Sequence, residues 1–132
     1  MSAFKYQKDP QGIVTITMDM SGPVNAMNDE YHVAMSESLA KLESETDLSG
    51  VVIASAKSVF FAGGDLNMLL AAKREDAYEF FAGAQAMKAD LRRLEQLSVP
   101  IVAAINGAAL GGGYEICLAC NYRVAFNHKS VQ

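Results

Sequence analysis

The sequence contains little cysteine and has no excess of positive charge. Its 132 residues include 11 Lys and Arg against 15 Asp and Glu, so the net charge is −4 and the basic surface of a nucleic-acid-binding protein is missing. No apolar core follows the first charged residues, and we therefore expect no secretory signal. With 2 cysteines and no export signal, the chain suits a reducing compartment, and we expect it to be cytoplasmic.

Several motifs that would indicate a metal, a phosphate group or a nucleophile are missing as well. Cys117 and Cys120 form a C-x-x-C without a second Cys or His pair, so we expect no metal and interpret both as small buried packing residues. No G-x-G-x-x-G follows a strand, no lysine follows the glycines as in a phosphate-binding loop, and no G-x-S-x-G supplies a nucleophile.

Long hydrophobic runs are limited to residues 101–120. This run is long enough to span a membrane, but Asn106, Glu115 and the glycines between them argue against burial in lipid. Hydrophobic residues make up 51% of the chain and charged residues 20%, which is typical of a globular protein. We expect one domain with a sizeable core and no membrane span.

The most informative stretch covers residues 100–123. An apolar β-prone run leads to a turn at Asn106-Gly107, to three consecutive glycines at 111–113, and to a helical segment that carries Glu115. Glycines allow backbone N–H groups to approach a ligand, and the first N–H groups of a helix favour an oxygen with negative charge. These residues indicate a candidate catalytic centre with an acid beside that oxygen. The alternative is a structural loop whose glycines serve tight packing and whose glutamate is solvated.

The same construction occurs once earlier in the chain. A strand predicted at residues 50–56 leads to Phe61-Ala62, then to Gly63-Gly64, an acid and a helical segment at residues 66–72. Two such turns at the ends of neighbouring strands would aim two N–H donors at one oxygen, as an oxyanion hole requires. In the absence of the other motifs, the residues favour polarisation of a carbonyl group together with a carboxylate acid or base.

Regular elements are predicted around these two turns. Strands at residues 3–8 and 12–19 form a hairpin, Asn28 caps a helix that reaches about residue 45, and a short strand follows at residues 122–126. A longer helix at about residues 76–97 has an apolar stripe of Phe80, Ala84, Met87, Leu91 and Leu94. The repeated order of strand, glycine turn and helix predicts an α/β fold.

Four segments carry a resemblance to a known family. Phe61-Ala62-Gly63-Gly64-Asp65-Leu66 and the run at residues 106–115 together resemble the paired signature of the crotonase superfamily, the enoyl-CoA hydratase/isomerase family. Residues 25–27 resemble its early loop, and residues 118–123 are most similar to the hydratase portion of multifunctional fatty-acid oxidation α-subunits. The resemblance implies a crotonase-like spiral of strand-strand-helix repeats, with residues 1–132 as the N-terminal part of a hydratase/isomerase domain.

The resemblance also implies an activity and a set of site residues. The activity is hydration or isomerisation of 2-enoyl-CoA thioesters in fatty-acid β-oxidation, with coenzyme A as part of the substrate and no separate cofactor. By motif position, the N–H groups of Gly64 and Gly112 would hold the thioester oxygen, and Glu115 would act on the water added at Cβ. Residues at substrate- and CoA-contacting positions are Val24, Ala62, Gly64, Asp65, Leu66, Asn67 and Gly112.

The match to the family is incomplete. Hydratases carry a second glutamate beyond the glycine-rich helix, which protonates the α-carbon, and nothing after Arg123 supplies it here. We therefore expect that the chain alone lacks full turnover and that exposed apolar edges favour a homo-oligomer. Other crotonase-type chemistry, namely isomerisation, decarboxylation or thioester hydrolysis, remains an alternative, as does a non-catalytic CoA-binding or assembly module.

Overall fold

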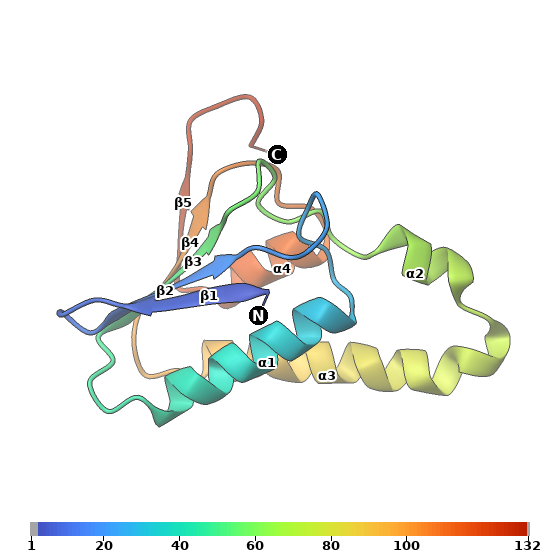
Figure 1. Ribbon diagram of the computed structural model, residues 1–132, viewed down its shortest axis with the longest axis horizontal. Coiled ribbons are helices and arrows are strands. Elements are labelled where there is room, and N and C mark those ends of the chain that lie inside the picture. The colour runs from blue at the N-terminus through green and yellow to red at the C-terminus, as the bar shows by residue number, and fades with distance from the viewer. Residues whose placement is uncertain (1–2, 132) are drawn as a thin grey trace.

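Five strands form one sheet in the order β1-β2-β3-β4-β5 in the computed structural model, which describes residues 3–131 (Figure 1). β1 (Phe4–Lys8) and β2 (Ile13–Met18) are antiparallel and form the predicted hairpin. β3 (Gly50–Ser55), β4 (Ile101–Ile105) and β5 (Tyr122–Ala125) then add in parallel to β2. Each strand lies within a segment predicted to be extended, so this part of the prediction is confirmed.

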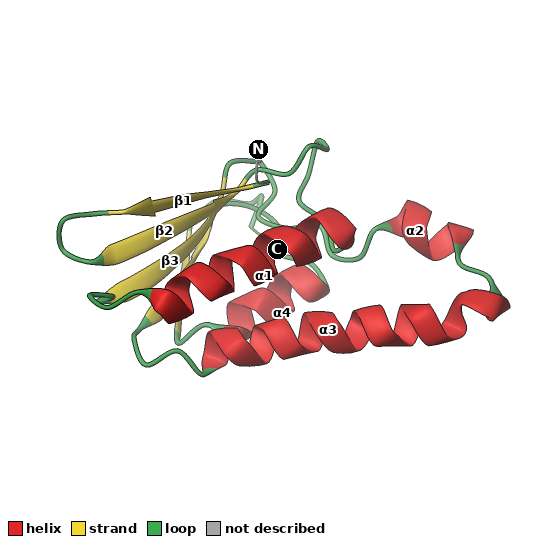
Figure 2. Cartoon of the chain, turned by 60° about the horizontal axis from the view of Figure 1, so that its bottom comes forward, coloured by secondary structure: helices red, strands yellow, loops and turns green. Residues whose placement is uncertain are grey.

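The helices connect the parallel strands and gather on one side of the sheet (Figure 2). α1 (Asp29–Ser44) follows β2, and α4 (Gly112–Ala119) follows β4. Between β3 and β4 lie α2 (Leu66–Ala71), the short 3₁₀ turn η1 (Arg74–Asp76) and α3 (Ala77–Glu95). In both ribbon views α2 stands apart from the sheet, at the far end of α3. The α/β prediction, with its strand-strand-helix unit, is confirmed.

The start and the buried side of α1 follow from its sequence. The Asn28 side chain accepts a hydrogen bond from the Tyr31 N–H at 3.1 Å, which gives one of the first unpaired donors a partner. Met35, Leu39 and Leu42 are buried, as their helical spacing predicts. Beneath them lie the inward residues of the sheet, because alternate positions of β2 and β4 face the helices.

α3 leaves most of its predicted apolar stripe partly or fully exposed. The predicted apolar stripe consists of Phe80, Ala84, Met87, Leu91 and Leu94, and within it only Leu94 is buried. The C-terminal half of α3 packs on α1, where Arg93 pairs with Glu43 at 2.8 Å and with Asp90 at 2.9 Å. The N-terminal half extends past α1 towards α2, so its apolar side has no sheet to cover and lines a cavity instead.

The long apolar run at residues 101–120 is divided between β4, a loop and α4. Within residues 3–131, no helix combines the length and the apolar character needed to cross a bilayer. Ile116 and Cys117 of α4 are fully buried, and Gly113 brings this helix against Phe61, whose ring stacks edge-on with Tyr31 at 5.2 Å. α4 therefore joins the hydrophobic core directly after the glycines.

We expect Gly113→Ala to destabilise the fold by about 2 kcal/mol, because overpacking a tight contact costs this much. A Cβ at Gly113 would lie 2.5 Å from the Phe61 Cβ and 2.8 Å from its carbonyl oxygen, so the backbone must move. Gly83→Ala is the matched control, since its Cβ meets nothing within 4 Å and alanine favours the helix by up to about 1 kcal/mol. Urea denaturation measures both, and equal stability of the two variants would contradict the tight contact.

Candidate active site

The loops that follow β3 and β4 run side by side. The Phe61 N–H donates to the Ala108 carbonyl at 3.1 Å, and the Leu110 N–H donates back to the Phe61 carbonyl at 3.0 Å. These bonds form a short parallel bridge between Phe61 and Ala109, beyond the ends of the two strands. Because parallel strands end at the same edge of a sheet, the two glycine turns that were similar in sequence become neighbours in space.

The loop after β2 joins the loop after β3 on its other side. The Ala62 N–H donates to the Asn25 carbonyl at 2.8 Å, and the Met27 N–H donates to the Gly63 carbonyl at 2.8 Å. The Asp65 N–H then donates to the Met27 carbonyl at 3.2 Å. Three loops from three consecutive parallel strands are thus connected through their main chains, with the Gly63-Gly64 turn in the middle.

The Asn25 side chain fixes the start of this arrangement. It is fully buried, its oxygen accepts from the Met20 N–H at 3.2 Å, and its Nδ2 donates to the Ser55 hydroxyl at 2.9 Å and the Phe60 carbonyl at 3.2 Å. One amide therefore ties the end of β2 to the end of β3. The sequence analysis used Asn25 only as part of a resembling segment and did not predict this role.

The two turns need glycine for two different reasons. Gly63 and Gly111 have positive φ angles of 91° and 50°, a backbone conformation that side chains disfavour. At Gly112 the reason is space, because a Cβ there would displace the flexible Met27 thioether from its observed position. The turns are also in direct contact, since a Cβ at Gly63 would lie 3.0 Å from the Leu110 carbonyl oxygen.

The two predicted donors have no backbone acceptor in the part of the chain that the structure describes. Within residues 3–131, the N–H groups of Gly64 and Gly112 donate to no backbone carbonyl, while the neighbouring N–H groups of Asp65 and Gly113 do. Gly112 is the first residue of α4, where the helix leaves its N–H groups without internal partners. Glu115 lies in the first turn of the same helix, and its side chain is exposed.

The buried Tyr31 hydroxyl is influenced by the negative charges of Asp90 and Glu115. Burial, followed by the charges of Asp90 and Glu115, raises the pKa of the Tyr31 hydroxyl well above its usual range. This places Glu115 within electrostatic reach of a buried residue at the centre of the core. The Tyr31 hydroxyl has no hydrogen-bond partner in the part of the chain that the structure describes.

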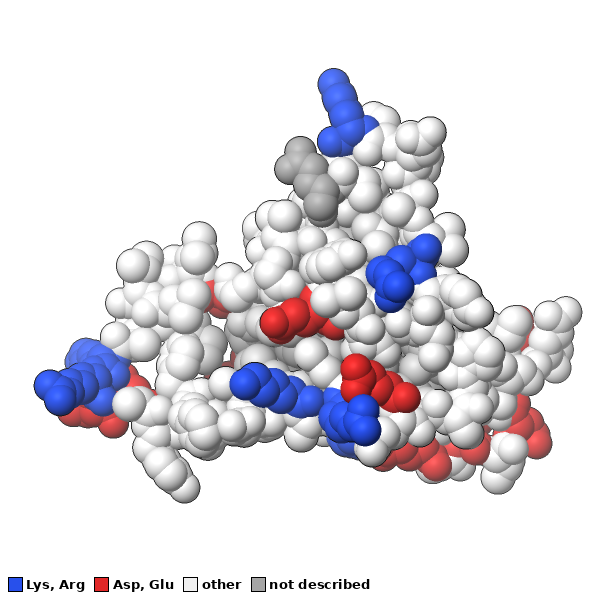
Figure 3. Space-filling model, turned by 180° about the vertical axis from the view of Figure 1, so that it is seen from behind, with Lys and Arg blue, Asp and Glu red and all other residues white. Residues whose placement is uncertain are grey.

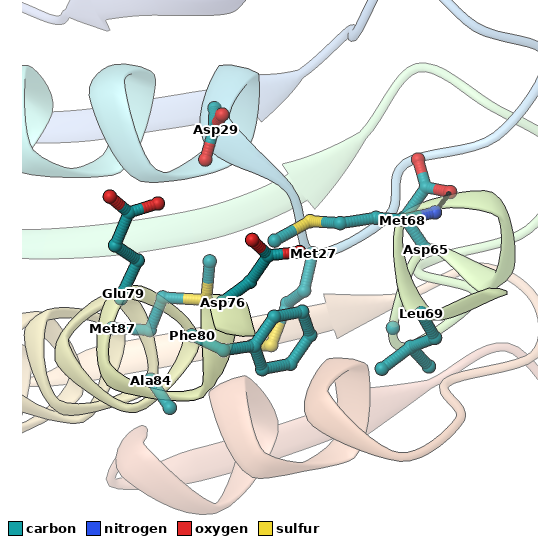
Figure 4. Close-up of a pocket in the computed structure, with 12 residues that line it drawn as sticks. Met27, Asp29, Asp65, Met68, Leu69, Asp76, Glu79, Phe80, Ala84 and Met87 are labelled. Carbon is teal, nitrogen blue, oxygen red and sulfur yellow. Dashed lines mark hydrogen bonds between the residues drawn. The ribbon is translucent and has the colours of Figure 1, made fainter. Parts of the chain in front are cut away.

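A first cavity, of about 350 Å³, opens between α2 and α3 (Figure 4). Met27, Met68 and Met87 reach it from three different elements, and the ring of Phe80 lies next to the Met27 sulfur. Its apolar wall is completed by Leu69 and Ala84, and its acidic lining residues are Asp29, Asp65, Asp76 and Glu79. Phe80, Ala84 and Met87 of the predicted apolar stripe thus form one wall of this cavity.

A second cavity, of about 500 Å³, lies on the other side of Gly64. Both cavities share Gly64 and Asp65, so the middle glycine turn separates them. Neither Gly112 nor Glu115 is among the residues lining the two cavities. The charged residues lining the second cavity are Glu30 and Asp65, and Lys57 outside it pairs with Asp19 at 3.0 Å.

Comparisons with known proteins show the family of this chain. A family model described as enoyl-CoA hydratase/isomerase matches residues 8–131. The chain belongs to the enoyl-CoA hydratase/isomerase family. It is 38% identical over 128 residues to the fatty acid oxidation complex subunit alpha of Shewanella frigidimarina, and 43% identical over 125 residues to that of Shewanella loihica. These matches cover 96% and 92% of this chain but only 18% and 17% of the relatives.

Solved structures of hydratases share the fold. The enoyl-CoA hydratase from Bacillus anthracis has 27% identity and a TM-score of 0.82, with 93% of this chain and 47% of the other covered. The enoyl-CoA hydratase of Mycobacterium smegmatis, at 24% identity and a TM-score of 0.85, supports the fold alone, with 95% and 48% covered. The chain therefore spans about half the length of these hydratases. The structural similarity confirms the predicted crotonase-like fold.

Of the seven positions that the family resemblance assigned to substrate and CoA contacts, all except Gly112 line one cavity. Val24, Ala62, Gly64, Asp65, Leu66 and Asn67 all line the second cavity. The Asp65 carboxylate itself caps α2, because it accepts the N–H groups of Asn67 at 2.9 Å and Met68 at 3.2 Å. The Asn28 amide also donates to the Asp65 carboxylate at 3.4 Å. The bond from Met68 has the largest effect on the Asp65 pKa, followed by the bond from Asn28, and together they hold this pKa below its usual range. Contacts between these residues and CoA remain predicted.

We expect Cys117 and Cys120 to react slowly with thiol reagents in the native protein. Both are buried and free, and burial raises the pKa of the Cys117 thiol to about 11 and that of Cys120 to about 12. Since the thiolate is the reactive form, modification at pH 8 is expected to be slower than in the unfolded chain by about 100-fold or more, and faster as pH rises. Reaction with an aromatic disulfide reagent, with and without urea, measures this, and equal rates would contradict the packing interpretation.

Proposed function

We propose that this chain binds an acyl-CoA thioester and polarises its carbonyl group, as part of a hydratase or isomerase that acts on 2-enoyl-CoA in fatty-acid oxidation. One observation carries the proposal: the N–H groups of Gly64 and Gly112 lack backbone acceptors on two glycine turns that contact each other. Membership of the enoyl-CoA hydratase/isomerase family supports acyl-CoA as the ligand class. Glu115, one turn into α4, is the proposed acid and base.

The proposed reaction uses these groups in a fixed order. Glu115 accepts a proton from water as the water oxygen bonds to Cβ of the enoyl group. The electrons of the C=C bond move towards the thioester oxygen, where the two N–H donors stabilise the enolate-like charge. The enolate then collapses as Cα takes a proton from an acid. By resemblance to hydratases of the family, that proton would come from a second glutamate.

The main-chain donors suit this task because folding has already positioned them. A side-chain donor would lose rotamer freedom when it binds the oxyanion, whereas Gly64 and Gly112 are held by bridged loops and a helix start. Loss of one such donor typically costs about 3 kcal/mol of transition-state stabilisation. The helix dipole of α4 adds to the attraction for negative charge at the same point.

We assign the two cavities to the two ends of the substrate. The cavity of about 350 Å³ between α2 and α3 has four acidic lining residues and an apolar wall, and we assign the acyl chain to that wall. The cavity of about 500 Å³ beyond Gly64 has no Lys or Arg among its lining residues. It therefore suits the neutral pantetheine arm of CoA rather than its phosphates. The thioester would lie at the turn between them.

We expect Glu115→Gln to abolish most hydration when this segment stands within a whole hydratase domain. Glutamine cannot accept the proton of water, so crotonyl-CoA hydration should fall by about 10²–10⁴-fold while acyl-CoA affinity stays close to wild type. Absorbance of the enoyl thioester measures the rate, and calorimetry measures the affinity. Glu37→Gln, an exposed acid on α1, is the control and should leave both values unchanged.

The 132-residue chain by itself is expected to bind acyl-CoA without completing hydration, because Glu115 is the single acid assigned to the reaction here. Ordinary crotonyl-CoA turnover by the purified chain would contradict this assignment. Equal hydration by wild type and the Glu115→Gln variant of a whole domain would contradict the role of Glu115. Absence of any acyl-CoA binding would leave the glycine turns with a purely structural role.

We also expect the chain to self-associate in solution. Figure 3 shows charged side chains mainly along the lower edge and at one end of this face, while the upper part is largely uncharged apart from a few separate acidic and basic groups. Large apolar residues of α4, β5 and the adjoining loops are at least 46% exposed, namely Leu110, Tyr114, Leu118, Tyr122, Val124 and Phe126. Such surfaces and edge strands favour association. Light scattering should give a mass above 14.2 kDa, and Val124→Lys should lower it, whereas a monomer at high concentration would contradict the expectation.

A further inference from the structure

Met27 contacts both of the glycine turns that carry the proposed donors. Its N–H donates to the Gly63 carbonyl and its carbonyl accepts from the Asp65 N–H, so its main chain runs beside Gly64. Its side chain packs on Gly112, where a Cβ would lie 2.3 Å from the Met27 Sδ and 2.7 Å from its Cε. The position of this one residue is therefore coupled to both donors.

The same thioether also reaches the apolar cavity. Figure 4 shows the Met27 side chain extending towards Phe80, with its sulfur beside the ring. Met27 thus lies between the glycine turns and the apolar wall formed by α3. If the thioester oxygen is held at Gly64 and Gly112, the carbons next to the carbonyl group must enter the cavity past this side chain.

We propose that Met27 is a specificity-determining residue that selects acyl groups without a branch next to the thioester carbonyl. This inference rests on the proposed function, because the donors fix where the carbonyl group lies. A methyl branch at Cα needs the space that the Met27 thioether fills, and one methyl group in a packed apolar site changes affinity by about tenfold or more. Farther from the carbonyl group, Met68 and Met87 form an adaptable wall of the cavity. The length of the acyl group is therefore restricted less than its branching.

The test compares two isomeric saturated thioesters, butyryl-CoA and isobutyryl-CoA, which differ in the branch at Cα. Calorimetry measures the Kd of each for the 132-residue chain and for Met27→Leu, Met27→Val and Met27→Ala. Met87→Ala is the matched control. Met87 lines the same cavity, but none of its atoms is among those nearest to a Cβ at Gly112. Circular dichroism confirms that each variant is folded.

We expect wild type to bind butyryl-CoA about tenfold more tightly than isobutyryl-CoA. This ratio should persist in Met27→Leu and Met87→Ala, fall in Met27→Val and approach one in Met27→Ala. If the alanine variant does not fold, the difference between the leucine and valine variants carries the test.

A ratio near one in wild type, or one unchanged by removal of the thioether, would overturn the role of Met27. The same loss of preference in Met87→Ala would also overturn it, because cavity volume alone would then explain the effect. Failure of wild type to bind either thioester more tightly than free CoA would overturn the proposed function itself. The two failures are therefore distinguishable.

Discussion

The buried amide of Asn25 is the interaction on which the site depends. It lies outside every helix and strand, yet it is fully buried and bonded to the last residue of β2, to β3 and to the loop after β3. An amide both donates and accepts, so it satisfies main-chain groups of opposite kinds at one point. An apolar side chain there would leave several buried groups without partners, at about 1–3 kcal/mol each. The amide fixes the loop after β2 against the loop after β3 at a point that precedes Gly64 in the sequence.

From this point the sheet topology positions the rest of the site. β3 and β4 are adjacent and parallel, so the turns that follow them emerge at the same edge. Main-chain bonds from Phe61 to the loop after β4 continue the pairing beyond the strands. Two constructions that lie far apart in the sequence thus meet through their main chains, and the Asn106 side chain adds a bond to the Lys57 carbonyl at 2.8 Å. A site made of main-chain donors needs this kind of support, because its geometry is that of the backbone itself.

Local patterns predicted the elements well because the relevant physics is local. The Asn28 cap and the spacing of Met35 and Leu39 determine where α1 begins and which side it buries, whatever lies beneath it. For Phe80 and Met87 in α3, the same logic predicted the apolar side of the helix but not the cavity that this side lines. Periodicity shows which side of a helix is apolar, and it cannot show whether a sheet or a cavity lies opposite. That depends on α3 extending beyond α1, which is a property of the assembled chain.

The role of Asn25 was beyond prediction for a similar reason. Asparagine in a loop after a strand is typical of a turn, and its partners Ser55 and Phe60 lie 30 and 35 residues away in the sequence. The glycine turns could be predicted because the same order of strand, glycines and acid occurs twice. Consecutive glycines after a strand also indicate a tight turn or a close approach of the backbone. The proximity of the two turns is observed in the structure, whereas the shared acceptor between Gly64 and Gly112 is a proposal.

The three consecutive glycines show how the site and the core are coupled. Gly111 supplies the left-handed backbone that starts α4, Gly112 leaves room for Met27, and Gly113 lets the helix approach Phe61. Each glycine answers a different constraint, and only the first concerns conformation. An N–H without an internal partner at Gly112 is unfavourable for the helix, and burial of Ile116 one turn later offsets that cost. The donor can therefore remain available because the next turn of the same helix is anchored in the core.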